Sequence, residues 1–215
     1  MDMAAMKLVA GLFALVLMSG CAIGQVYDYD GAAVELPVMG SGTLGLGVVD
    51  RRPYIIDGDK NPDFVGLQRG GYGNPFDVTT DSGNSLASDM ETALANELSA
   101  NGFEIVELHF SSPDAAIIAS AIKSSVAGRN VVLTVREWKT DAMYNFGLSY
   151  DISLEVFDNT ATLLASAETS ANKEKLGGSG MQEANSVAAV HAFSRVAGRL
   201  FNNAAIKGAL EEKQE

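Results

Sequence analysis

The stretch "NVVLTVREWKTDAMYNFGLSYDISLEVFDNTATLLASAETSA", residues 130–171, decides the fold. It holds three segments rich in β-branched and aromatic residues, the composition typical of strands: 130–140, 144–157 and 161–171. Polar and small residues at 141–142 and 158–159 separate them. Three consecutive strands with such short connections predict an antiparallel meander.

An amphipathic helix and a strand precede the meander. Four apolar residues recur at every fourth position and predict a helix over 86–98: Leu86, Met90, Leu94 and Leu98. Ser85 or Asn84 can serve as its N-cap. Residues 101–102, Asn-Gly, supply a left-handed stop, after which "FEIVELHF" at 103–110 predicts a strand.

Two further helices complete the predicted domain. One should run from Pro113 to about Val126 and stop at Gly128, and the last should span about 185–210. Amphipathic helices on both sides of a run of strands predict an α+β fold with an antiparallel sheet and helices packed mainly on one face. We expect the helices at 86–98 and 185–210 to pack side by side.

The N-terminal region has the features of a secretory signal. An apolar run, Leu8–Met18, follows Lys7 and ends in small residues before the single cysteine, Cys21. The run is too short for a transmembrane helix, and Met1, Met3 and Met6 are alternative starts.

The letters "MSGC" at 18–21 resemble the lipobox of bacterial lipoproteins. The resemblance implies that Cys21 is lipidated, becomes the first mature residue and anchors the protein to a membrane. Ala22 is not the Asp common in lipoproteins that stay at the inner membrane, which favours the outer membrane, on its periplasmic side. The alternative is an ordinary cleaved signal followed by an unpaired thiol.

Composition predicts one globular domain behind this signal. We divide the chain into a signal peptide, a lipidated tether with a short strand near 33–36, a single α+β periplasmic domain and a charged tail: 1–20, 21–42, 43–211 and 212–215. The net charge is −12 with or without residues 1–20. So acidic a chain is a poor partner for nucleic acid, and we expect attachment through lipid rather than a basic patch.

Residues 50–83 have no clear periodicity, and segments of this kind inside a domain are often functional. Arginine and aromatic residues are the types that anchor interfaces, so the candidate partner-binding residues are Arg51, Arg52, Arg69, Tyr72 and Phe76. A hairpin that only packs along the sheet edge is the competing interpretation. The acidic residues at 57–63 resemble the start of a calcium loop, but Pro62 and Gln68 stand where that loop needs Gly and Glu, so we assign no metal.

Catalysis has little support in the sequence. The imidazoles are His109, in an apolar strand, and His191, on a helix, while Cys21 is assigned to lipid. No zinc-ligand set, nucleophile motif or cofactor motif accompanies them. We therefore expect a non-catalytic protein without a cofactor.

A resemblance to a family supports the same picture. The lipobox, "VVDRRP" at 48–53 and "LSANGFEIV" at 98–106, followed by strands and a last helix, resemble the poorly characterised YajG-like outer-membrane lipoproteins over about 43–205. The chain departs from them after Pro53. The expected function is a non-catalytic interaction or accessory module of a cell-envelope assembly, with a protein partner. The alternative is a periplasmic binder of a small, glycan or lipid ligand in a groove between sheet and helices.

Overall fold

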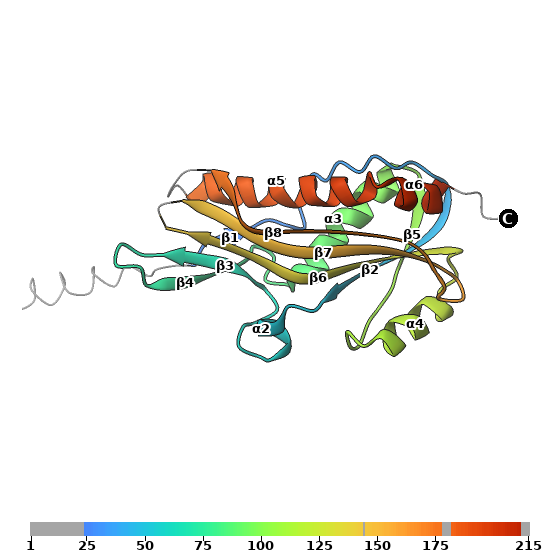
Figure 1. Cartoon of the computed structure of the whole chain (residues 1–215), viewed down its shortest axis with the longest axis horizontal. Helices are drawn as coiled ribbons and strands as arrows, with labels where there is room; N and C mark the ends of the chain where they lie inside the picture. Colours follow the sequence, from blue (N-terminus) through green and yellow to red (C-terminus); the bar gives the residue numbers. More distant parts are fainter. Residues whose placement is uncertain (1–23, 144, 178–181, 212–215) are drawn as a thin grey trace, which may run out of the picture.

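The computed structural model describes residues 24–143, 145–177 and 182–211. Its main feature is one mixed sheet around the long strand β6 (Figure 1). The strands are β1 (Val26–Tyr27), β2 (Gly42–Asp50), β3 (Phe64–Arg69), β4 (Pro75–Thr80), β5 (Phe103–Glu107), β6 (Arg129–Ala142), β7 (Phe146–Asp158) and β8 (Leu163–Gly177). The helices are α2 (Pro53–Ile56), α3 (Leu86–Ala100), α4 (Ala115–Ser124), α5 (Gln182–Phe201) and α6 (Ala204–Glu211).

The predicted meander is confirmed. β6 pairs antiparallel with β7 along its whole length, and β7 pairs antiparallel with β8. The boundary after the first strand differs, because residues 141–142 continue β6 instead of forming the turn. β8 likewise extends past 171 to Gly177.

The sheet as a whole is mixed, so the prediction of an antiparallel sheet is corrected. The second edge of β6 is shared by β2, beside residues 129–135, and β3, beside residues 140–142, and both run parallel to it. β5 also runs parallel to β2. Helices α3 and α4 supply the crossovers that parallel neighbours need. Local turn signals reveal the meander but not these pairings between distant segments.

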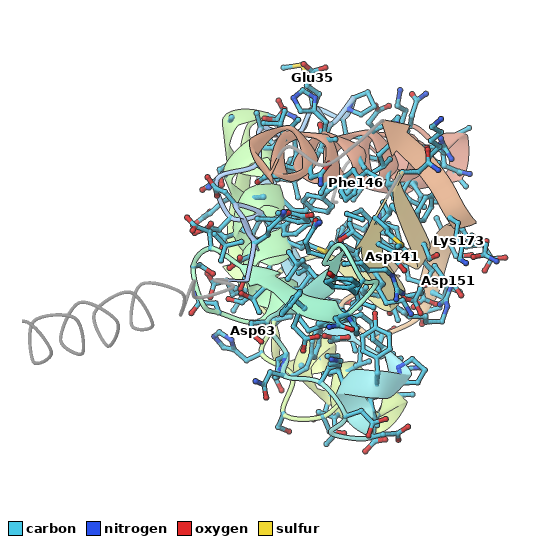
Figure 2. All side chains as sticks on the ribbon, turned by 90° about the vertical axis from the view of Figure 1, so that its left-hand side faces the viewer. Glu35, Asp63, Asp141, Phe146, Asp151 and Lys173 are labelled. Carbon is cyan, nitrogen blue, oxygen red and sulfur yellow. The ribbon has the colours of Figure 1, made fainter. Side chains whose placement is uncertain are left out.

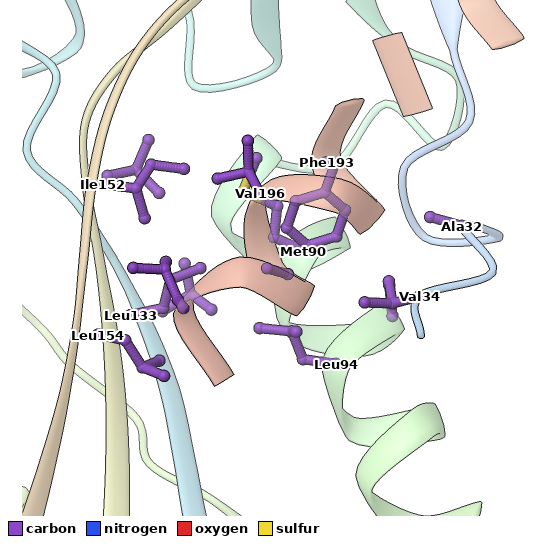
Figure 3. Close-up of a cluster of buried hydrophobic side chains, with 14 of the residues drawn as sticks. Ala32, Val34, Met90, Leu94, Leu133, Ile152, Leu154, Phe193 and Val196 are labelled. Atoms are coloured by element: carbon purple, nitrogen blue, oxygen red, sulfur yellow. The ribbon is translucent and has the colours of Figure 1, made fainter. Parts of the chain in front are cut away.

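Helices α3, α5 and α6 lie on one face of the sheet, which confirms the predicted α+β arrangement (Figure 1). Figure 3 shows Met90 and Leu94 of α3 close to Phe193 of α5, within a core that also contains Leu133 and Ile152 from the sheet. Helix α4 lies on the opposite face, over a smaller cluster: Val49, Leu108, Ile118, Ile122 and Val132. Among the described residues, no helix is long and apolar enough to cross a membrane.

The predicted caps of α3 are present. The Ser85 hydroxyl accepts a 3.2 Å hydrogen bond from the Ser88 amide. At the other end Gly102 has φ +101°, a conformation that glycine adopts without strain. The last helix is interrupted: α5 ends at Phe201, and the Asn203 side chain accepts a 2.9 Å hydrogen bond from the Ala205 amide at the start of α6.

The segment before β2 is part of the packed domain, which corrects its assignment to a tether. Alternate side chains are buried in the main core: Ala32, Val34, Leu36 and Val38. The Asn101 side-chain amide donates a 3.1 Å hydrogen bond to the Leu36 carbonyl, and the Glu35 amide donates one of 3.3 Å to the Ser194 hydroxyl. This extended segment therefore joins α3 to α5 without becoming a strand.

Residues 50–83 form α2 and the antiparallel β3–β4 hairpin. Although these residues show no clear periodicity in the sequence, they form regular structure. The hairpin at the sheet edge, one of the two interpretations given above, is present. β1 adds to the hairpin's outer edge by pairing parallel with β4. The hairpin consequently projects beyond the body of the domain at one end (Figure 1).

Candidate functional site

Four strands have one of their ends where the β3–β4 hairpin projects. β3 pairs parallel with the last residues of β6, so both reach the same end, where β7 begins and β8 finishes. We call this region the hairpin end. Its side chains are Arg69, Tyr72, Phe76, Lys139, Met143, Lys173 and Lys175. Figure 2 looks onto it.

The tip of the hairpin presents apolar side chains to solvent. The turn closes by hydrogen bonds of 2.9 Å from the Gly70 amide to the Asn74 carbonyl and 2.8 Å from the Gly73 amide to the Gly70 carbonyl. Tyr72 is 98% exposed, Phe76 39% and Met143 37%. Since large apolar side chains are more often buried, these exposed side chains at one end of the domain are candidates for a contact surface.

Cationic side chains surround a pocket of about 630 Å³ next to the tip. Arg69 binds Asp141 through two hydrogen bonds, of 2.8 and 2.7 Å. Lys139, Lys173 and Lys175 also line the pocket. In the described part of the chain none of these three lysines forms an ion pair. The pocket therefore carries an excess of positive charge although the chain is acidic.

The backbone of β8 is distorted at Lys173, one of the lysines that line the pocket. Lys173 has φ +52°, within the left-handed region that side chains other than Gly and Asn avoid. The pairing of β7 with β8 shifts register here, and the Lys173 amide donates a 3.1 Å hydrogen bond to the Ser149 hydroxyl. Bulges of this type redirect side chains. Lys173 and Lys175 line the pocket, whereas Glu174 pairs with Arg195 of α5 at 2.6 Å.

Three of the predicted site residues belong to the hairpin end: Arg69, Tyr72 and Phe76. Phe76 lies opposite Gln68, so it is on the other face of the hairpin from Arg69. Arg51 lies elsewhere, half-buried, and donates a hydrogen bond to the Pro113 carbonyl near α4. Cys21 lies outside the described residues.

Arg52 is corrected from a contact residue to a structural one. Its side chain is 0% exposed. The guanidinium binds the Asp50 carboxylate at 2.7 Å and the Pro62 carbonyl at 3.1 Å, and it also donates to the Phe64 carbonyl. With these partners inside the fold, Arg52 holds the start of the hairpin against the end of β2 and cannot reach a partner.

The lysines and Met143 of the hairpin end were not predicted from the sequence. Lys139 lies in the stretch that predicted the meander, and Lys173 and Lys175 lie beyond the predicted end of its third strand. The alternation of Lys with other polar residues at 172–175 was the available signal, because alternate residues of a strand share a face.

A second concave region lies between α3 and the ends of β2 and β5. It has a volume of about 450 Å³, and Glu91, Glu107, His109 and Phe110 line it. The Glu91 carboxylate accepts a 2.9 Å hydrogen bond from the Val48 amide. Burial raises the pKa of Glu91, Glu107 adds to this effect, and the Val48 hydrogen bond opposes it. Within the described ranges, no group of three or more His, Cys, Asp or Glu side chains is arranged to hold a metal ion.

Comparisons with known proteins concern the fold. No family model and no curated protein matches the chain. Protein XCC0632 of Xanthomonas campestris, described with the family model DUF330, is similar with a TM-score of 0.53 and 12% identity over 82% of this chain and 94% of that one. PelC of Paraburkholderia phytofirmans has a TM-score of 0.42 and 13% identity, covering 84% and 95%.

Lipoprotein GNA1162 of Neisseria meningitidis is a more distant likeness, with a TM-score of 0.36 and 11% identity over 71% of this chain and 96% of that one. At such identities a structural likeness shows the fold and does not transfer a function. The chain thus shares its fold with XCC0632, and its function has to be argued from its own surface.

Proposed function

We propose that this protein is a lipid-anchored, non-catalytic accessory lipoprotein on the periplasmic side of the outer membrane, similar to the YajG-like family. It acts by contact with another component of the cell envelope, and the hairpin end is its contact surface. Lipid on Cys21 supplies the anchor. The lipobox-like "MSGC" at 18–21 supports the anchor, and the hairpin end supports the contact.

One observation carries the proposed contact: a fully exposed aromatic side chain, Tyr72, lies in the hairpin turn at the same end of the sheet as a pocket lined by lysines that have no ion-pair partners in the described chain. Exposed aromatic side chains and arginine are enriched at contact surfaces, and the unpaired lysines add a charge that an anionic partner would match. The hairpin that bears Tyr72 is held firmly to the sheet by β3–β6 pairing and by the Arg69–Asp141 ion pair. A rigid support of this kind keeps a surface ready for its partner.

The two imidazoles of the chain lie on different segments of the fold. His109 has a side chain 85% exposed beside the α3 groove, and His191 is exposed on α5.

Fractionation and crosslinking in cells test this proposal. The Cys21→Ser variant should leave the outer-membrane fraction, because the thioether to lipid requires the thiol. A photo-crosslinking residue at position 72 of the lipidated full chain should give an adduct with an envelope component. The same residue at Val187, which is 53% exposed on α5, is the matched control. Retention of Cys21→Ser in that fraction, or equal adducts from both positions, would contradict the proposal.

A second candidate function is recognition of a small polar ligand in the groove beside α3. The observation in its favour is the groove itself, about 450 Å³ in volume, with Glu91, Glu107 and His109 on its walls. A ligand that binds only the native state raises the melting temperature. Glycan fragments that stabilise the wild type but not a Glu107→Gln variant would support this candidate.

A further inference from the structure

We propose that the hairpin end rests on the membrane surface, with anionic phospholipid headgroups in its lysine-lined pocket. This inference rests on the proposed function in one respect, the lipid on Cys21, and it names the component that the contact surface meets. The arguments come from where the described chain begins, from the charges of the pocket and from the exposed side chains at the tip.

The described chain begins beside the hairpin. A Cβ on Gly24 would lie 2.6 Å from the Asp77 carbonyl oxygen, and the Thr79 amide donates a 3.1 Å hydrogen bond to the Gln25 carbonyl. β1 runs parallel to β4, so each residue toward the N-terminus lies one step closer to Pro75 and the tip. Gly24 is therefore next to the part of β4 that leads into the turn.

Covalent reach then limits where the lipid can enter the membrane. Two residues separate Gly24 from Cys21, and the three Cα–Cα steps between them span at most about 11 Å when extended. A lipid on Cys21 must enter the bilayer within that distance of Gly24. A linker this short brings the adjacent hairpin end to the bilayer surface.

The charge of the hairpin end is complementary to an anionic surface. Its three lysines line the pocket, and the nearby carboxylates are neutralised: Asp141 pairs with Arg69 and Asp151 with Arg136, at 2.7 and 2.8 Å. The whole chain has a net charge of −12, so the excess of acidic residues lies outside this pocket. Because salt screens charges beyond about 10 Å, the lysines of the pocket act on a nearby anionic surface more strongly than the distant acidic residues of the chain do.

The apolar side chains at the tip suit the headgroup region. Tyr72 is exposed in the hairpin turn, and Met143 is exposed and lines the lysine pocket, while Phe76 is exposed on the opposite face of the hairpin. Tyrosine is enriched at membrane interfaces because its ring is apolar and its hydroxyl is polar. The left-handed backbone of Lys173 is consistent with a position selected for its charge, since Gly or Asn would fit it with less strain.

Vesicle binding by the unlipidated chain tests the inference. A chain that begins at Ala22 keeps every contact described here, because all the strands, helices and core residues given above lie between residues 24 and 211. It should cosediment with vesicles of equimolar phosphatidylcholine and phosphatidylglycerol more than with phosphatidylcholine alone, and added salt should weaken binding.

Two double variants with the same change in net charge separate a local site from a general effect. Lys173→Asn/Lys175→Gln should reduce partitioning by roughly 25-fold, at about fivefold for each lysine. Asparagine at 173 tolerates the left-handed backbone, so the fold is retained. Lys123→Gln/Lys207→Gln, with charges removed from α4 and α6, should reduce it little. Equal losses in both variants would overturn the inference.

Other outcomes distinguish the possible occupants. Inorganic phosphate that raises the melting temperature of the wild type, but not of Lys173→Asn/Lys175→Gln, without any vesicle binding would assign the pocket to a free anion. An adduct from position 72 to a protein instead of a lipid would assign the hairpin end to a protein partner. Either result overturns the membrane contact and leaves the lipid anchor intact, whereas retention of Cys21→Ser in the outer membrane would refute the anchor itself.

Discussion

The indole nitrogen of Trp138 in β6 donates a 2.8 Å hydrogen bond to the hydroxyl of Tyr29, 109 residues earlier in the chain. Both side chains are fully buried, and their rings meet edge to face with centroids 6.0 Å apart. The first described residues are thereby fixed to the centre of the sheet. This contact anchors the segment that follows β1, and β1 itself pairs with β4.

Tyr29→Phe should destabilise the domain by about 1–3 kcal/mol, because it leaves the buried indole N–H without its acceptor. Trp138 is the single tryptophan of the chain, so its fluorescence during urea unfolding measures the change directly. Tyr72→Phe, at an exposed position, is the control and should leave the free energy of unfolding unchanged. Equal stability of both variants would mean that solvent replaces the hydroxyl.

Leu94→Asp should unfold the domain. Leu94 is fully buried on α3 against the sheet, and an unpaired carboxylate at that position costs several kcal/mol. Circular dichroism and thermal unfolding measure the effect. Asn96→Asp adds the same charge on the exposed side of the helix and should keep the native melting temperature within a few degrees. A folded Leu94→Asp variant would show that α3 can leave the core.

Arg52→Met should cost about 3–5 kcal/mol, because Asp50 keeps its charge but loses its partner in a nearly closed site. Asp50→Asn/Arg52→Met should recover much of that loss, since no charge then remains. Urea unfolding of the two variants and the wild type measures both steps. Normal stability of Arg52→Met combined with a lost adduct from position 72 would restore Arg52 to the contact surface.

Local signals account for the parts of the fold that the sequence predicts. The stripe and caps of α3 involve neighbouring residues, and the meander depends on turns of a few residues. The parallel pairing of β2 with β6 joins segments separated by three helices and three strands, and no local pattern reports it. The packing of Val34 between α3 and α5 is equally nonlocal, so a segment with few strand signals appeared to be a tether.

The residues of the candidate site also divide into those with a local signal in the sequence and those brought in by nonlocal pairing. Arg69, Tyr72 and Phe76 belong to one hairpin, so a search of one segment finds them. The lysines come from β6 and β8 and join the site only through the sheet. Arg52 has the residue type of an interface anchor, but its guanidinium binds the Asp50 carboxylate and the Pro62 carbonyl inside the fold. The sequence alone does not show these contacts.

Glu91 should make stability depend on pH in a direction that the structure fixes. The pairing of β2 with β5 extends only to Leu46. The Val48 amide instead donates its hydrogen bond to the Glu91 carboxylate. Burial raises the pKa of Glu91 in the folded state. The folded state therefore binds the proton of Glu91 more tightly than the unfolded state does. The contribution of Glu91 to the free energy of unfolding falls as pH rises from its unfolded-state pKa through its folded-state pKa.

Glu91→Gln removes this titration and keeps an oxygen acceptor for the Val48 amide. The stability of the variant minus that of the wild type should increase from about pH 4 toward neutrality and then become constant, because other titrating groups cancel in the difference. Urea unfolding at a series of pH values gives this curve. A constant difference would mean that Glu91 has the same pKa in both states. A difference that decreases with rising pH would mean that the Val48 hydrogen bond outweighs burial, and the carboxylate would then stabilise the edge of β2 in its charged form.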